Sequence, residues 1–181
     1  MANSLRERYS QIVNENHIIV DNLLGKNCLG YNIQYVFSKD QLSIFDHLQQ
    51  QISKPEFPNL YQLPEQSLHI SIAWILATRT DYGRQKDLIW QEIKDKCCFE
   101  LDTISKTFQK FVVTFQDIIA TDSAIILVAQ DHGEMSELRT KISTQLPIPQ
   151  MTNNKAEIIH ATLFKYTSPL NDPKSFLEHI S

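Results

Sequence analysis

Alternation of apolar and polar side chains along the chain predicts short strands and amphipathic helices. Residues 31–37 alternate, with Asn32 and Gln34 facing away from the aromatic and aliphatic positions, which predicts a strand. A helix capped by Asp40 is expected next, and its apolar stripe consists of Leu42, Phe45, Leu48 and Ile52. The apolar stretch 67–77 then predicts a buried strand.

The rest of the chain carries a similar set of signals. The predicted elements are a helix at 82–98, a hairpin at 110–129, a helix that starts at Asp131 and Glu134 and stops at Pro147, a strand at 157–166 and a short helix after Pro173. This order of strands and helices predicts an α+β fold with two similar halves. Each half contains one strand that carries a histidine.

Composition favours one ordinary globular domain over residues 1–181. The chain is 42% hydrophobic and 21% charged, and no apolar run approaches the roughly 20 residues of a membrane span. The polar first residues lack the apolar stretch of a secretory signal. Cys28, Cys97 and Cys98 cannot all pair, so we expect reduced thiols and a cytoplasmic location. Residues 1–28 form an N-terminal extension whose helical or extended character the pattern leaves open.

The charge balance bears on the partners that the protein can bind. Seventeen Lys and Arg against 21 Asp and Glu give a net charge of −4, and no basic run is present. A protein that binds duplex DNA along its backbone is therefore not expected. A site that grips one or two phosphates needs only a few local donors and stays open.

The strand around His69 has an unusual polar face. Side chains alternate across a strand, so His69, Ser71 and Ala73 are expected on one face. The opposite, core-facing set consists of Leu68, Ile70, Ile72 and Trp74. An imidazole and a hydroxyl therefore stand side by side on an otherwise apolar strand.

The strand around His160 repeats this arrangement. His160 and Thr162 share one face, and the apolar side chains of Ile159, Ala161 and Leu163 share the other. A third His-x-Ser/Thr tripeptide begins at His179, close to the end of the sequence, where no strand surrounds it. We treat that copy as a chance occurrence.

These two motifs resemble the signature of the 2H phosphoesterase superfamily, the LigT-like and cyclic-phosphodiesterase-like proteins. The matching segments are His69-Ile70-Ser71-Ile72 and His160-Ala161-Thr162-Leu163, 91 positions apart. Trp74 lies where many members carry an aromatic residue, and Lys165 lies where LigT-like members often have arginine. The resemblance covers residues 30–167. It implies a two-lobed α+β fold in which antiparallel-rich sheets form a central cleft and helices pack outside.

The resemblance also implies a metal-independent phosphodiesterase without cofactors. His69 and His160 would be the general acid and base, in an order that the sequence leaves open. Ser71 and Thr162 would bind the phosphate oxygens. Lys165 would add a cation, although strand alternation puts it on the face opposite Thr162. The implied substrate is a 2′,3′-cyclic phosphate or a 2′-5′ linkage in RNA, an oligonucleotide or a nucleotide. The protein is expected to be a monomer.

Other interpretations stay open at this point. One alternative is an exonuclease of the same superfamily that trims 3′ RNA ends. Another is a non-catalytic module that binds nucleotides or RNA ends. The third is an α+β interaction protein in which the histidine pairs are coincidental. A zinc site is disfavoured, because His69 and His160 lack a third ligand at a recognisable spacing. The sequence contains no Gly-x-Ser-x-Gly elbow and no phosphate-binding Gly-rich loop.

Overall fold

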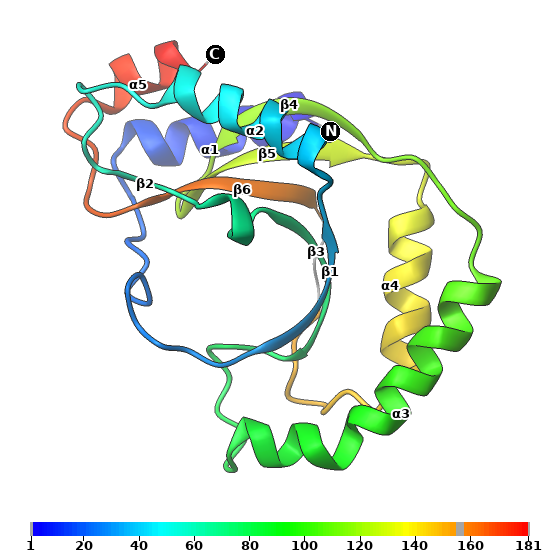
Figure 1. The fold of residues 1–181 in the computed structure, drawn as a ribbon. Helices are drawn as coiled ribbons and strands as arrows, with labels where there is room; N and C mark the ends of the chain where they lie inside the picture. Colours follow the sequence, from blue (N-terminus) through cyan, green and yellow to red (C-terminus); the bar gives the residue numbers. More distant parts are fainter. Residues whose placement is uncertain (1, 155–157, 181) are drawn as a thin grey trace.

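The computed structural model describes residues 2–154 and 158–180, which form a mixed α+β structure around a bent antiparallel sheet (Figure 1). The six strands have the order β1-β3-β6-β5-β4, and the short β2 pairs with β6. Strands from the two halves of the chain therefore share one sheet, joined where β3 meets β6. Within the described residues, no helix combines the length and apolar character that a membrane span requires.

The predicted strands and the helices after residue 38 have counterparts in the structure. The strands are β1 (Tyr31–Val36), β2 (Leu60–Gln62), β3 (His69–Leu76), β4 (Thr114–Ala120), β5 (Ala124–Gln130) and β6 (Ile159–Tyr166). The helices are α1 (Ala2–Asn14), α2 (Lys39–Ile52), the 3₁₀ turn η1 (Glu65–Ser67), α3 (Lys86–Thr107), α4 (Glu134–Gln145) and α5 (Pro173–His179). The sequence pattern did not predict β2 or η1.

Two helices differ from the sequence expectation in their ends. Ser38 rather than Asp40 caps α2, because Ser38 and Gln41 form a reciprocal capping box. Helix α3 starts at Lys86 and continues beyond the predicted end at residue 98. Its buried stripe extends to Ile104, so core packing supports the additional turns.

The two faces of the central strands have different environments. Ile70 of β3 and Ala161 and Leu163 of β6 are buried in the main core, to which α2 and α5 contribute. We call the opposite face of β3 and β6 the inner face. Over β5, helix α1 covers that side, where Leu5 and Tyr9 pack against Ile119, Ala124, Ile126 and Val128.

A β-bulge interrupts each of the two histidine strands, on β3 at Ile72 and on β6 at Leu163. On β3, Ser71 pairs with Gln34 and Ala73 pairs with Ile33, which leaves Ile72 as the extra residue. A bulge of one residue reverses the in–out alternation of the residues beyond it, up to the next register shift, which on β3 lies at Ile75.

The same reversal occurs on β6, where the register skips Leu163. Thr162 pairs with Ile126, and Phe164 pairs with the next residue, Ile125. Lys165 then pairs with Ala124, which clusters with Ile126 on the side of Thr162. Lys165 therefore lies on the inner face, and the expectation that alternation puts it opposite Thr162 was wrong.

The bulge on β3 corrects a second expectation. Ala73 is 4% exposed and packs in the core near α3 and α4, instead of lying beside His69. Trp74 pairs with Asn32 and lies on the inner face, instead of joining Ile70 in the core. Both bulges thus bring the fifth residue after a histidine onto the histidine's own face.

A buried polar side chain from a helix binds the carbonyl group of each bulge. Gln49 of α2 is 2% exposed, and its Nε2 donates to the carbonyls of Leu163 and Leu63, both at 2.9 Å. Arg139 of α4 is 9% exposed, and its guanidinium donates to the carbonyls of Ile72 and Ser71, both at 3.0 Å. These bonds satisfy backbone groups that a regular ladder would have paired.

The role of Gln49 predicts a loss of stability on Gln49→Leu. The substitution removes the amide donor shared by two buried carbonyls, so the free energy of unfolding should fall by about 1–3 kcal/mol. Urea denaturation measures this. The matched control is Gln50→Leu, at the neighbouring exposed position of the same helix, which should change the unfolding free energy by less than about 0.5 kcal/mol. Equal effects of the two substitutions would contradict this account.

Candidate functional site

The pairing of β3 with β6 brings the two histidine motifs together. Ile70 pairs with Ala161, and both side chains enter the core. The residues on either side of this pair therefore point to the inner face: His69 and Ser71 on β3, and Thr162 and His160 on β6. His69 is adjacent to Thr162, and Ser71 is adjacent to His160. All four side chains are partly exposed, whereas Ile70 and Ala161 are buried.

Hydrogen bonds fix the orientation of the His69 ring. Nδ1 lies 2.8 Å from the carbonyl oxygen of Ser67, which only accepts, so Nδ1 carries a proton. Nε2 lies 3.0 Å from the hydroxyl oxygen of Ser71. In the neutral ring Nε2 therefore accepts a hydrogen bond from Ser71, and it is the nitrogen that can exchange a proton with a ligand.

His160 has a different environment. Its Nδ1 atom is buried and has no hydrogen-bond partner among the described residues, so Nε2 is the nitrogen left to face a ligand. Burial lowers the pKa of His160 below its ordinary value of 6.5. An interaction with the backbone of Ile158 opposes part of this shift, and the positive charges of Arg139 and Lys165 and the nearby His69 lower the pKa further. The neutral ring, which can accept a proton, is thus favoured near pH 7.

Beyond the four motif side chains, the inner face has a different residue type at each end. Lys165 and its strand partner Tyr61 lie past Thr162. Trp74 and its partner Asn32 lie past Ser71. Along the inner face, Lys165 and Tyr61 therefore lie at one end, the two histidines and two hydroxyls in the middle, and Trp74 at the other end.

The connection between α1 and β1, residues 15–30, forms a strap along this face (Figure 1). Asp21 connects the strap to both sides of the site: its carboxylate lies 2.6 Å from the Arg79 guanidinium and 3.8 Å from Lys165 Nζ. Gly30 ends the strap against β3, where an added Cβ would lie 2.5 Å from Thr78 Oγ1. The extension whose role the sequence left open thus contributes a wall of the site.

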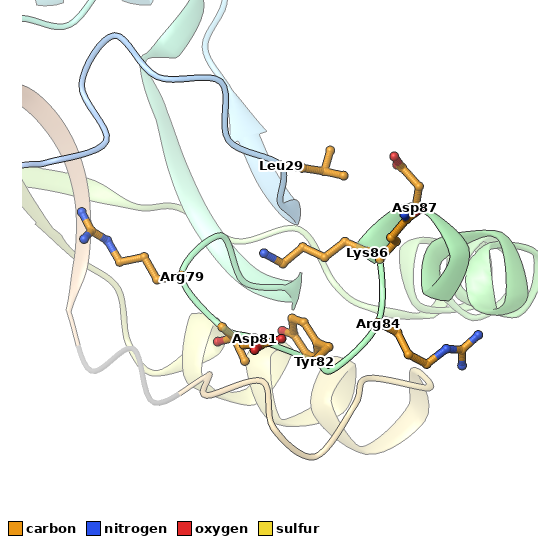
Figure 2. A pocket seen from close by; sticks show the side chains of 9 residues that line it. Leu29, Arg79, Asp81, Tyr82, Arg84, Lys86 and Asp87 are labelled. Atoms are coloured by element: carbon orange, nitrogen blue, oxygen red, sulfur yellow. The ribbon is translucent and has the colours of Figure 1, made fainter.

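A cavity of about 510 Å³ lies at the loop between β3 and α3, and Figure 2 shows its cations. Arg79 bonds to the strap, Arg84 pairs with Glu92 at 2.5 Å, and Lys86 donates to the carbonyl of Thr78. Because each cation already has a partner and two aspartates also line the cavity, it is a poor anion site. Among the described residues, no three His, Cys, Asp or Glu side chains gather where they could hold a metal ion.

The sequence did not predict that Tyr61, Asp21 and Arg139 shape this site. It also did not predict that Trp74 lies on the inner face. Arg139 had a readable signal, because it follows Met135 by four residues and so lies within the apolar stripe of α4. A charged side chain on a core-facing stripe needs internal partners. Tyr61, Asp21 and Trp74 had no comparable local signal.

Comparisons with known proteins add little to this geometry. No family model matches the chain, and a search of curated proteins gave no significant match. Among solved structures, the chain is similar to the protein TT0787 of Thermus thermophilus, with a TM-score of 0.48 and 13% sequence identity. The match covers 78% of this chain and 76% of that one. A likeness of this strength carries no argument about family or function.

The contacts of Arg139 predict a change in the titration of His160. Arg139→Met removes a positive charge, so the pKa of His160 should rise but stay below 6.5, because burial is the larger cause of the shift. NMR titration of the imidazole resonances measures it. Arg139→Lys should keep the pKa low, and Arg84→Met, at an exposed ion pair, should leave it unchanged. A lower or unaltered pKa in Arg139→Met would contradict the charge effect.

Proposed function

We propose that the protein is a phosphodiesterase of the 2H type, acting on a 2′,3′-cyclic phosphate or a 2′-5′ linkage in RNA, an oligonucleotide or a nucleotide. One observation carries the proposal: two His-x-Ser/Thr motifs, 91 positions apart in the chain, lie on neighbouring strands with all four polar side chains on one face. In this proposal the halves of the sheet on either side of β3 and β6 correspond to the two lobes of the superfamily fold.

His160 acts as the general base and His69 as the general acid. With a cyclic phosphate, Nε2 of His160 takes a proton from water as the water oxygen forms a bond to phosphorus. The bond from phosphorus to one ribose oxygen breaks, and Nε2 of protonated His69 gives that oxygen its proton. Water is added overall, and no redox partner is needed. The lowered pKa of His160 suits the accepting role, because the neutral ring is available near pH 7.

Ser71 and Thr162 donate hydrogen bonds to the phosphate oxygens that do not react. In the strand register Thr162 lies beside His69 and Ser71 beside His160, so the pair can hold the phosphorus between the two rings. The Ser71 hydroxyl, which lies 3.0 Å from Nε2 of His69, turns to the phosphate once that nitrogen is protonated. Lys165 supplies a positive charge at the Thr162 end, where Asp21 now pairs with it at 3.8 Å. An anionic ligand would compete with Asp21 for this cation.

Turnover with a chelator present tests the proposal. The purified protein is incubated with 2′,3′-cyclic nucleotides and a 2′-5′-linked dinucleotide, and the products are separated by chromatography. His69→Ala and His160→Ala should each lower the rate by about 10²–10⁴-fold, because each removes one proton-transfer group. His47→Ala, at an exposed position of α2, is the control and should keep full turnover.

Each alternative outcome has a distinct meaning. Full turnover in both histidine variants would sink the mechanism. Ligand binding without turnover would favour the non-catalytic binding module. A ladder of shortened products from a single-stranded oligonucleotide would instead identify the 3′-trimming exonuclease.

The two hydroxyls predict a smaller effect than the histidines. Ser71→Ala and Thr162→Ala should each lower kcat/KM by about 10- to 100-fold, the effect of losing one hydrogen bond to a charged group. Steady-state kinetics on the substrate found above measures it. Thr140→Ala, at an exposed position of α4, serves as the control. Unchanged kinetics in both hydroxyl variants would remove these residues from the phosphate site.

A further inference from the structure

The edge strand β1 adds a further column of side chains to the inner face. Gln34 pairs with Ser71, and Val36 pairs with His69. The extra residue of the bulge lies on β3, so β1 keeps a regular alternation and both side chains share the inner face. Both are exposed there. Ser71 therefore has His160 of β6 on one side and Gln34 of β1 on the other.

A hydrogen bond within β1 determines which end of the Gln34 amide is left for a ligand. Asn32, two residues earlier on the same face, donates from Nδ2 to Oε1 of Gln34 at 3.2 Å. Nε2 of Gln34 carries two N–H donors. Among the described residues, no backbone or side-chain acceptor lies within hydrogen-bond distance of it. The inner face thus presents an uncommitted donor directly beside Ser71.

The hydroxyl of Ser71 does not have this freedom. It has one proton, and while His69 is neutral that proton is directed to Nε2 of the ring, 3.0 Å away. In the proposed reaction His69 starts protonated and ends neutral, so Ser71 returns to the ring as the product forms. Gln34 is the neighbouring donor that is available in both protonation states of His69.

The position of Gln34 also suits its length. Side chains directly opposite on neighbouring strands have Cβ atoms about 4.5–5.5 Å apart, and a glutamine side chain spans most of that separation. Nε2 can therefore reach an oxygen that lies above Ser71. The next inner-face position on β1 is Val36, which offers no donor. The strand thus supplies a donor beside the hydroxyl and not beside the histidine.

We infer that Gln34 is a further phosphate-binding residue, which donates from Nε2 to the unreacting phosphate oxygen on the Ser71 side. This inference rests on the proposed function and deepens it. Gln34 exchanges no proton, and it holds the same oxygen before and after the bond to the ribose oxygen breaks. Asn32 acts through Gln34, as a positioning residue.

NMR of the side-chain amides tests the contact without relying on turnover. The Gln34 NH₂ resonances are assigned as the pair that disappears from the ¹H–¹⁵N spectrum in Gln34→Ala, and inorganic phosphate is the probe. Phosphate should shift this pair in a saturable way, together with the imidazole resonances of His160. The NH₂ pair of Gln109, in the exposed segment after α3, should not move. Absence of a shift at the Gln34 amide would overturn the inference.

Substitutions supply the second readout. Gln34→Ala should lower kcat/KM about 10-fold, the effect of losing one hydrogen bond to a charged group. Gln34→Glu keeps the shape but places a negative charge beside the phosphate, so it should lower kcat/KM at least about 5-fold more than Gln34→Ala does. Asn32→Ala should have a smaller effect than Gln34→Ala. Gln109→Glu introduces the same charge at an exposed position elsewhere and should change nothing. Circular dichroism confirms that each variant is folded.

The outcomes separate this contact from the reaction. A phosphate-dependent shift of the Gln34 amide without any turnover would keep the contact and reject the phosphodiesterase. Turnover that depends on His69 and His160 but is unchanged in Gln34→Ala and Gln34→Glu would keep the phosphodiesterase and overturn the contact. Equal losses in these two Gln34 variants would assign the side chain a structural role, which would also overturn the inference.

Discussion

The candidate site depends on two β-bulges whose carbonyl groups are bonded from behind the sheet. A bulge leaves backbone polar groups without ladder partners, and buried groups of this kind are costly unless another donor reaches them. Arg139 provides the donor for Ile72 on β3, and Gln49 provides it for Leu163 on β6. Because of the bulges, Trp74 and Lys165 lie on the inner face, where regular alternation would have placed them on the opposite one.

In both halves of the sheet a helix side chain thus donates to the carbonyl of the bulged residue, Arg139 in one half and Gln49 in the other. In each half a histidine is followed after two positions by a hydroxyl, after three by the bulged residue, and after five by a residue that returns to the inner face. The guanidinium of Arg139 also adds charge, and so it lowers the pKa of His160, whereas the neutral amide of Gln49 does not. Burial is the larger cause of the lowered pKa of His160, and the charge of Arg139 adds to it.

The strap gives this face its remaining boundary. It is attached near the β4–β5 turn, where Ile19 donates to the carbonyl of Asp122 at 2.7 Å, and at the end of β3 through Arg79. The carboxylate of Asp21 pairs with both Arg79 and Lys165, so it links the strap to β6 and to the segment after β3.

The sequence by itself determined the strands other than the short β2, most helices and the two histidine pairs, because each depends on the alternation or spacing of neighbouring side chains. It did not determine the faces of Lys165 and Trp74, since alternation holds only while the register is unbroken. Where a strand bulges depends on its partner strand and on a donor from a distant helix, as with Arg139 and Ile72. The adjacency of the two motifs and the closure by the strap are likewise contacts between segments far apart in the chain, so only the tertiary structure decided them.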